Sequence, residues 1–192
     1  MTRRLVVAIT GASGAVLGLS ALQLARTLDD VETHLIVTRA GRETVHLELD
    51  MTVKDVAALA DEVHADNDLA SPLASGSFPV TGMLVAPCSV TSLSAIAQSY
   101  DATLTVRAAD VTLKERRPLV LMLRETPLHA GHLRLMSEVT ASGGIIMPPV
   151  PAYYLKSDSV TEMARQTVAR AFDLIGMPLP DTRRWTGREE DA

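Results

Sequence analysis

The sequence Leu-Val-Val-Ala-Ile-Thr-Gly-Ala-Ser-Gly-Ala at residues 5–15 decides the fold of this chain. Residues 5–10 are apolar on both faces and predict a buried strand. Apolar residues at positions 17, 21, 24 and 28 then predict a helix. A strand, a glycine turn and a helix together are typical of a nucleotide-binding α/β unit. Glycines let the backbone approach a ligand closely, and the helix N-terminus offers free N–H groups to a phosphate.

The glycine turn does not match either of two common nucleotide-binding signatures. Ser13 stands where the dinucleotide pattern has its second glycine, and no Gly-Lys-Ser/Thr follows to make a P-loop. A hydroxyl in the turn suggests that Ser13 contacts a ligand. On its own, the turn leaves open a nucleotide or flavin phosphate site and a tight structural turn.

The composition narrows the class of protein. The 192 residues, 47% of them hydrophobic, suffice for one sizeable domain with a core, and the net charge of −5 argues against a general nucleic-acid binder. A single cysteine excludes an internal disulfide and fits a reducing compartment, so we expect a cytoplasmic protein. No secretory signal is recognised, and no apolar stretch reaches about 20 residues, so no membrane span is predicted.

Strand and helix patterns alternate along the whole chain. This alternation predicts an α/β fold, a doubly wound parallel sheet with helices on both faces. We expect residues 1–177 to form this domain and the polar residues 178–192 to form a C-terminal tail. Further strands are expected at 31–37, 83–86, 119–123 and 145–147, a loop at 61–78, and helices at 40–49, 53–60, 91–98, 105–116, 126–141 (starting at Thr126-Pro127) and 159–175.

Polar residues follow the predicted strands at the points where the strands end. In parallel α/β sheets, ligands bind outside the carboxyl ends of the strands, so these residues predict a site at that edge. They are Ser13, Thr38, Cys88-Ser89, Arg124-Glu125 and the loop before Tyr153-Tyr154.

Several charged residues suit chemistry at that edge. Helical spacing places Arg107 and Lys114 on one face with Asp110 between them. This pattern fits a solvated ladder of ion pairs, which the spacing favours, or two cations that meet a phosphate. Arg124 suits a bidentate phosphate contact, and Glu125 suits proton transfer.

Other residues have weaker signals. Glu48 is either a surface acid or a half-buried acid with a raised pKa. The spacing of His129 and His132 resembles that of metal ligands only loosely, and without a third ligand we expect no metal site. Cys88 is expected to be a small buried residue. Trp185, an apolar anchor in a polar tail, should dock on its own domain or on a neighbouring subunit.

Longer motifs resemble those of the UbiX/Pad1 flavin prenyltransferases over essentially the whole chain. The resemblance implies a flavodoxin-like fold and a homo-oligomer, commonly a dodecamer. It also implies reduced FMN and dimethylallyl phosphate as substrates, a prenyl unit joined to flavin N5 and C6, no metal, and delivery of the product to a UbiD-type decarboxylase. The matching stretches are residues 11–15, 74–78, 87–89, 107–121, 124–129 and 147–154.

The resemblance also implies roles for individual residues. The FMN contacts would be Gly11, Ala12, Ser13, Thr38, Ser89, Val90, Thr91, Ser92, Arg107 and Arg124. The donor phosphate would meet Lys114, Arg124, Tyr154 and Arg170, while Ser13, Glu48 and Glu125 would handle protons and Trp185 would cover the prenyl group. Cations and a hydroxyl stabilise a leaving phosphate, and an apolar cover keeps water from an allylic cation.

Three positions depart from the family pattern, and two other functions stay open. Thr38 replaces a serine, Val90-Thr91 stands where relatives carry a lysine, and Leu155-Lys156 replaces His-Arg. One alternative is an FMN-dependent cysteine-type decarboxylase, whose Pro-Ala-Ser-Ala-Asn-Gly-like stretch is missing here. The other is a non-catalytic FMN carrier, which would not need Lys114, Tyr154 and Arg170 together.

Overall fold

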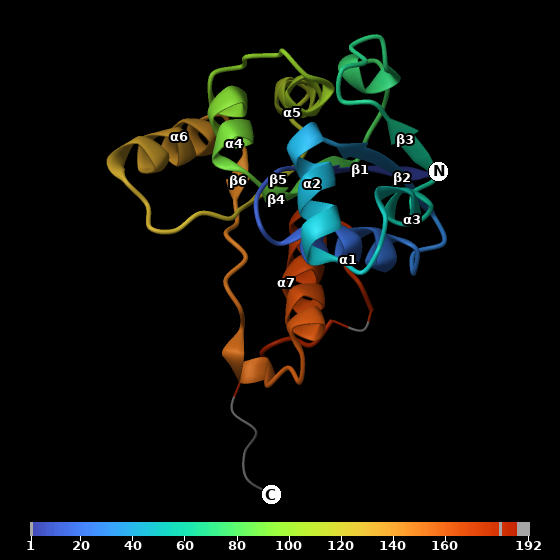
Figure 1. Ribbon diagram of the computed structural model, residues 1–192, viewed down its shortest axis with the longest axis vertical. Coiled ribbons are helices and arrows are strands. Elements are labelled where there is room, and N and C mark those ends of the chain that lie inside the picture. The colour runs from blue at the N-terminus through green and yellow to red at the C-terminus, as the bar shows by residue number, and fades with distance from the viewer. Residues whose placement is uncertain (1, 181, 188–192) are drawn as a thin grey trace, which may run out of the picture.

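A six-stranded parallel sheet forms the centre of the computed structural model, which describes residues 2–180 and 182–187 (Figure 1). The order of the strands reverses between β1 and β4, which creates a topological switch point at their carboxyl ends. Across the sheet the strands are β3 (Glu62–His64), β2 (Val31–Val37), β1 (Arg3–Ile9), β4 (Gly82–Cys88), β5 (Leu119–Leu123) and β6 (Ile145–Ile146).

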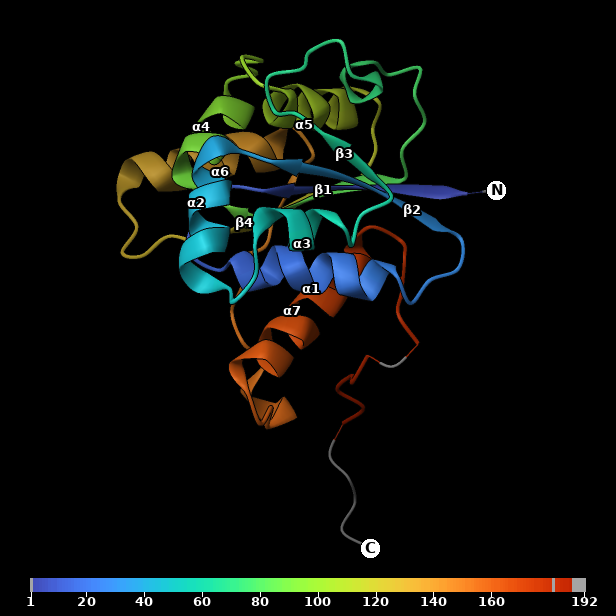
Figure 2. The ribbon, with the colours of Figure 1, turned by 45° about the vertical axis from the view of Figure 1, so that its right-hand side comes forward.

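Helices cover both faces of the sheet, which confirms the predicted doubly wound fold (Figure 2). Alternate residues of β1 belong to two separate cores: Leu5 and Val7 pack with α1 and α7, whereas Val6 and Ala8 pack with α4, α5 and α6. Burial on both faces explains why the strand is apolar throughout. The helices are α1 (Ala15–Ala25), α2 (Arg39–Glu48), α3 (Val53–Ala57), α4 (Val90–Ala97), α5 (Leu104–Lys114), α6 (Ala130–Ala141) and α7 (Val160–Leu174).

Most predicted elements are confirmed, but two short elements interrupt the predicted loop at 61–78. β2 and β5 coincide with the expected strands at 31–37 and 119–123. Residues 61–78 instead contain β3 and a 3₁₀ turn at Pro72–Ala74. β3 is a short, polar edge strand that pairs with β2, so its backbone bonding and not its own hydrophobicity makes it a strand.

The predicted start of the helix at Thr126-Pro127 is wrong. α6 begins at Ala130, and the ring nitrogen Nδ1 of His129 caps it by accepting a hydrogen bond from the N–H of Gly131 at 3.0 Å. The Thr126–Pro127 peptide bond is cis and lies in the loop that follows β5. The loop after β5 is therefore longer than the capping pattern predicted.

The chain leaves the sheet after β6 and returns along α7 (Figure 1). A 3₁₀ turn at Tyr153–Leu155 lies on this segment. After α7, Met177 and Leu179 are buried in the core formed by α1 and α7, so the chain packs on the body before residues 182–187. Within residues 2–180 and 182–187, no helix has the length and apolar character needed to cross a bilayer.

Candidate active site

A pocket of about 380 Å³ lies at the switch point, where the N-terminal ends of α2, α4 and α5 converge. We call it the hydroxyl pocket. It lies at the carboxyl edge of the sheet, where a ligand site was predicted, and two of the strand-end residues, Thr38 and Ser89, line it. Its lining includes five of the residues expected to contact FMN, namely Gly11, Thr38, Ser89, Thr91 and Ser92.

Two of the hydroxyls in this pocket cap the helices that form it. Oγ1 of Thr38 accepts from the N–H of Gly41 at 3.0 Å at the start of α2, and Oγ of Ser89 accepts from the N–H of Ser92 at 3.2 Å at the start of α4. Helix N-termini attract anions through their N–H groups and dipoles. The pocket therefore offers two such ends, with Arg39 as a cation in its lining.

The start of α5 is already paired with a carboxylate of the protein. Oδ1 of Asp66 accepts from the N–H of Thr105 at 3.0 Å and from its hydroxyl at 2.6 Å. Asp66 also lines the hydroxyl pocket. A bound anion would therefore be favoured at the ends of α2 and α4, away from this carboxylate.

Glu48 occupies the position at the glycine turn that the sequence predicted for a phosphate. Its Oε2 accepts hydrogen bonds from the N–H groups of Gly14 at 2.7 Å and Ala15 at 2.8 Å. Burial opposes ionisation, but the hydroxyl of Ser13, these two N–H groups and the charge of Arg124 together lower the pKa of Glu48. The alternative of a raised pKa is therefore wrong, because donors surround the carboxylate.

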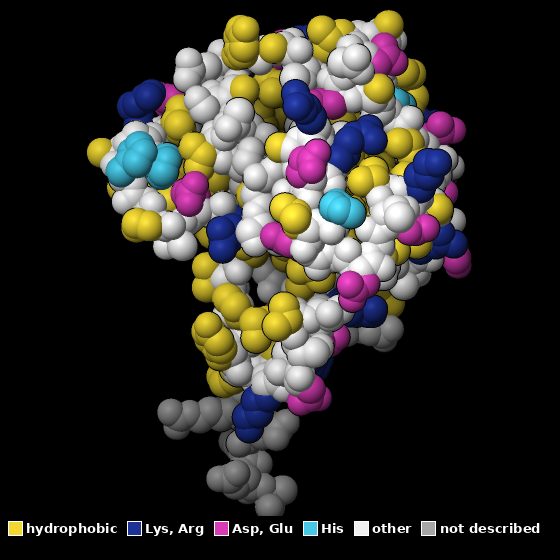
Figure 3. Space-filling view, in the orientation of Figure 1, with side chains coloured by type: hydrophobic (Ala, Val, Ile, Leu, Met, Phe, Trp, Pro, Cys, Tyr) yellow, Lys and Arg dark blue, Asp and Glu magenta, His cyan; other side chains and the backbone are white. Residues whose placement is uncertain are grey.

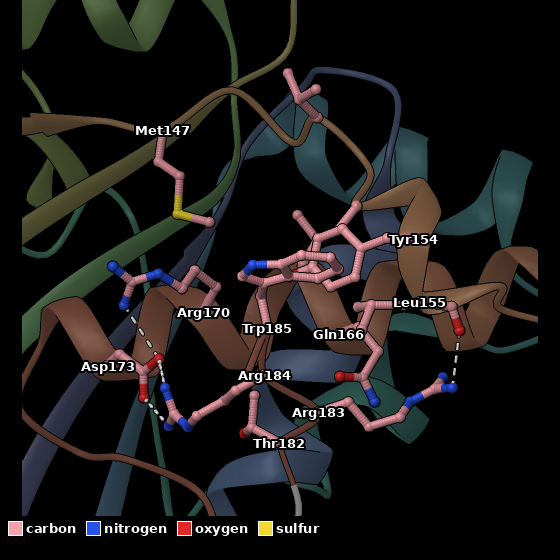
Figure 4. A pocket seen from close by; sticks show the side chains of 13 residues that line it. Met147, Tyr154, Leu155, Gln166, Arg170, Asp173, Thr182, Arg183, Arg184 and Trp185 are labelled. Carbon is pink, nitrogen blue, oxygen red and sulfur yellow. Dashed lines mark hydrogen bonds and ion pairs between the residues drawn. The ribbon is translucent and has the colours of Figure 1, made fainter. Parts of the chain in front are cut away.

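A second pocket, of about 360 Å³, lies between α7, the segment after β6 and the C-terminal residues (Figure 4). We call it the tail pocket. Tyr154, Arg170 and Trp185, all predicted for the prenyl donor, line it. The rings of Tyr154 and Trp185 meet edge to face with their centroids 5.4 Å apart, although Trp185 remains 64% exposed.

Arginines give the tail pocket a positive charge. Arg184 binds both carboxylate oxygens of Asp173 at 2.7 Å, and Arg170 donates to Oδ2 of the same carboxylate at 3.1 Å. Arg183 donates to the carbonyl of Leu155 at 2.9 Å and to Glu162 at 3.1 Å. Three guanidinium groups face two carboxylates, so one positive charge is left to attract an anion.

The carboxylate of Asp173 is held in its charged form. The hydrogen bond from Arg184 has the largest effect on its pKa, and together with the contact from Arg170 it outweighs burial, so the pKa of Asp173 is lowered. This carboxylate therefore stays charged across the neutral pH range.

Neither Arg107 nor Lys114, the two cations of α5, lines the hydroxyl pocket or the tail pocket. Arg107 pairs with Asp101 at 2.9 Å and with Asp110 at 3.2 Å. The Arg107–Asp110 pair is one of the two ion pairs in the predicted ladder. Lys114 pairs with Glu115 instead of Asp110. Because Lys114 ends α5 shortly before β5 begins, it lies at the amino edge of the sheet, opposite the hydroxyl pocket.

The remaining predicted residues occupy positions around the two pockets. Arg124 follows β5 and its N–H donates to the carbonyl of Cys88 at 3.1 Å, whereas the carboxylate of Glu125 is exposed and accepts from the N–H of Thr126 at 2.9 Å. Val90 lines a shallow neighbouring hollow and not the hydroxyl pocket. Ala12 and Ser13 belong to the glycine turn and also do not line the hydroxyl pocket.

Cys88 was considered as a nucleophile, and His129 and His132 were considered as metal ligands. Burial raises the pKa of the Cys88 thiol to about 12, so it is not a thiolate nucleophile. The rings of His129 and His132 lie 3.7 Å apart. Within the part of the chain that the structure describes, no three His, Cys, Asp or Glu side chains are grouped to hold a metal ion.

Sequence reasoning missed several of the charged residues that line the two pockets. Arg39 directly follows the predicted strand end at Thr38, a position that marks it as a candidate. Asp173 lies three residues after Arg170 on a helix, which predicts an ion pair but not a site. Asp66 and Arg184 carried no local signal, because their partners are far away in the sequence.

Comparisons with known proteins identify the family of this chain. Residues 1–171 match the family model described as Flavoprotein. The chain is 50% identical over 187 residues to the flavin prenyltransferase UbiX of Escherichia coli K12, covering 96% of this chain and 99% of the relative.

Two solved structures share the fold and much of the sequence. AnUbiX (PadA1) in complex with FMN and dimethylallyl pyrophosphate matches with a TM-score of 0.95 and 49% identity, covering 98% of this chain and all of that chain. A dodecameric FMN-dependent UbiX-like decarboxylase from Escherichia coli O157:H7 matches with a TM-score of 0.93 and 43% identity, covering 96% of this chain and all of that chain. With this identity over nearly its full length, the chain belongs to the UbiX family of flavin prenyltransferases.

Proposed function

We propose that this protein transfers the dimethylallyl group of dimethylallyl phosphate to N5 and C6 of reduced FMN and releases phosphate. The convergence of Tyr154, Arg170 and Trp185 on one pocket carries this proposal. A cationic group, a hydroxyl and an aromatic cover suit a donor with a phosphate at one end and an apolar group at the other. A protein that only stored FMN would not need this second pocket.

The hydroxyl pocket would hold FMN. Its residues fit that ligand, because Thr38, Ser89 and the first turns of α2 and α4 offer donors to a phosphate. Gly11 packs so closely on α2 that an added Cβ would lie 2.3 Å from the Cβ of Ala40. When bound, reduced FMN supplies the nucleophilic N5 and C6 atoms. Further contacts would come from Ala12, Ser13, Val90, Thr91, Ser92, Arg107 and Arg124.

The tail pocket would hold the prenyl donor. Arg170 and the hydroxyl of Tyr154, with Lys114 and Arg124, would stabilise the negative charge that develops on the leaving phosphate. Trp185 would lie over the dimethylallyl group and keep water from the allylic carbon. The positive charge left over in this pocket supports its assignment to the phosphate-bearing substrate.

Glu48 and Ser13 would handle protons next to the flavin. The lowered pKa makes Glu48 a carboxylate that accepts a proton, and the Ser13 hydroxyl donates a hydrogen bond to it. Glu125, exposed after β5, would serve as the second acid–base group. Glu48 would therefore act as a base, because it is already a carboxylate when the reaction begins.

Neighbouring copies of the chain would complete each site. The hydroxyl and tail pockets share no lining residue, and Lys114 lies at the opposite edge of the sheet. Hydrophobic side chains gather over the segment after β6, where Val150 and Tyr153 are exposed (Figure 3). We therefore propose a homo-oligomer, and the dodecameric relative favours a dodecamer.

The cellular setting follows from the same proposal. The single cysteine is a free buried thiol, which suits the cytoplasm. The prenylated flavin would be passed to a decarboxylase of the UbiD type, as the family resemblance implies.

One anaerobic experiment tests the reaction. The purified protein is incubated with reduced FMN and dimethylallyl phosphate, and the flavin is analysed by mass spectrometry. The proposal expects one FMN bound per chain and a flavin that gains one dimethylallyl unit. Unchanged flavin that remains bound would instead establish an FMN carrier. Loss of carbon dioxide from a peptidyl cysteine with oxidised FMN would establish the cysteine-type decarboxylase.

A further inference from the structure

One carboxylate in the tail pocket receives two arginines from different parts of the chain. Arg184, near the C-terminus, binds both oxygens of Asp173 at 2.7 Å, and Arg170 on α7 binds Oδ2 at 3.1 Å (Figure 4). The side chain of Asp173 is only 9% exposed, so water competes little for these bonds. A bidentate arginine–carboxylate pair fixes orientation as well as distance. The Arg184–Asp173 pair therefore fixes the orientation of the C-terminal segment on α7.

Trp185 is the residue that this pair places. It follows Arg184 directly and packs edge to face on Tyr154. Arg183 anchors the same segment at a second point, near the start of α7, through Glu162 and the carbonyl of Leu155. Because Asp173 lies near the end of α7, the two anchors prevent the segment from sliding along the helix.

We propose that Asp173 is a positioning residue that fixes the side chains at both ends of the donor site. Through Arg184 it holds the indole of Trp185, and directly it holds the guanidinium of Arg170. This inference rests on the proposed function, in which Arg170 meets the donor phosphate and Trp185 covers the prenyl group. One carboxylate would thereby keep the phosphate contact and the prenyl cover at a constant separation.

The charges of this cluster explain why an uncharged residue would not serve. Asp173 neutralises one of its two arginines and leaves the other charge for an anion. With Asp173→Asn the shape is kept, but two guanidinium groups would face each other without a carboxylate. The weaker Arg170 contact and the C-terminal segment would then both be released.

The position of Trp185 can be measured without any turnover. Trp185 is the only tryptophan of the chain, so its fluorescence in the flavin-free protein reports this segment alone. Asp173→Asn and Arg184→Gln should shift its emission to longer wavelength and raise its quenching by acrylamide. Arg184→Lys, which keeps the charge but loses the fork, should lie between Arg184→Gln and the wild type.

A matched control breaks a similar ion pair elsewhere. Arg3 binds both oxygens of Asp30 at 2.8 and 2.6 Å at the start of β1. Arg3→Gln should leave the emission and the quenching of Trp185 at their wild-type values. Thermal unfolding of each variant shows whether the fold survives, so a general loss of structure is recognised.

Kinetics then separate the two arms of Asp173. Asp173→Asn releases Arg170 as well as the C-terminal segment. KM for dimethylallyl phosphate should then rise about tenfold, as expected when the donor phosphate loses the charge-assisted bond from Arg170. Arg184→Gln leaves the Arg170–Asp173 contact in place and should lower kcat more than it raises KM. Equal KM values for the two variants would overturn the direct arm to Arg170.

The fluorescence result decides the inference independently of the proposed function. Wild-type quenching of Trp185 in both Asp173→Asn and Arg184→Gln would overturn the positioning role, whatever flavin product is formed. Increased quenching in both variants, with no prenylated flavin from the wild type, would support the positioning role and overturn the proposed function.

Discussion

Oε2 of Glu48 lies 2.7 Å from the backbone nitrogen of Gly14, so a carboxylate at the end of α2 caps the first turn of α1. Gly14 has no side chain to cap the helix, and the bond from Ala15 to the same oxygen adds a second donor. The anion position that a glycine turn usually offers is thus filled from within the protein. This contact supports the proposal that the FMN phosphate binds at the starts of α2 and α4.

Glu48→Gln should bind both substrates yet slow turnover by about 100-fold or more, because an amide does not accept the proton that a general base removes. The amide oxygen still accepts hydrogen bonds from the turn, so FMN affinity should stay within about threefold of the wild type. Glu43→Gln, an exposed change on the same helix, is the control. Wild-type turnover in Glu48→Gln would refute its role as a base.

Lys114→Ala should leave FMN bound and weaken the reaction with the donor. Removal of one contact to the leaving phosphate costs about 2–4 kcal/mol of transition-state stabilisation, which is read from kcat/KM. Lys54→Ala, on the exposed side of α3, controls for the loss of a surface charge. An equal loss of FMN affinity would show that Lys114 serves the flavin or the fold.

Mixed oligomers test whether Lys114 acts in a neighbouring site. If Lys114 and Arg170 reach one donor from different chains, co-assembly of Lys114→Ala with Arg170→Ala should restore part of the activity that each variant lacks alone. Some mixed sites would then contain both intact residues. No recovery in verified mixed oligomers would place both residues in the site of a single chain.

Removal of the residues after Pro180 should abolish donor turnover and largely preserve FMN binding. The deletion takes away Trp185 and both anchoring arginines, while the hydroxyl pocket is built from earlier segments. An earlier deletion after Ile175 would also remove Met177 and Leu179, which are buried in the core. Flavin fluorescence titration and product analysis measure the two effects. A truncated monomer with full turnover would overturn the shared, tail-covered site.

Acidification should destabilise the protein through a pair of histidines at the β2–β3 edge. Nδ1 of His34 lies 2.9 Å from Nε2 of His64, and His34 is only 3% exposed. The pair needs one nitrogen as an acceptor, so protonation of both rings would break this hydrogen bond. Desolvation lowers the pKa of both histidines. The negative charges of Glu32 and Glu62 oppose this effect at His34, and those of Glu62 and Asp68 oppose it at His64. Arg4 on β1 lowers the pKa of His34 further.

The sign of this effect follows from proton linkage. The unfolded chain binds protons near pH 6.5, before the folded histidines do, so the free energy of unfolding should fall as pH drops below that value. Urea unfolding at pH 7.5 and 5.5 measures the difference. His64→Gln keeps hydrogen-bonding groups but does not titrate there, and should reduce the pH dependence. His46→Gln, exposed on α2, should not change it. Equal pH dependence in His64→Gln and the wild type would contradict the assignment.

The sequence by itself determined the architecture and the edge of the sheet at which the hydroxyl pocket lies. Apolar runs at residues 5–9, 35–37 and 119–123 specify strand segments that are buried on both faces, and their alternation with helices specifies a parallel sheet. Hydroxyls at Thr38 and Ser89 follow such strands directly, so their meeting in one pocket follows from the topology. These features are local, so short stretches of the sequence show their periodicity.

Only the tertiary structure decided which charged groups meet. Glu48 caps a helix that begins 33 residues earlier, Asp173 holds an arginine 11 residues further on, and β3 exists because β2 offers it an edge. Lys114, grouped with the other site residues by resemblance, lies at the far edge of the sheet in its own chain. Such contacts depend on how the elements pack, and a local pattern of apolar and polar residues does not record the distance between segments far apart in the chain.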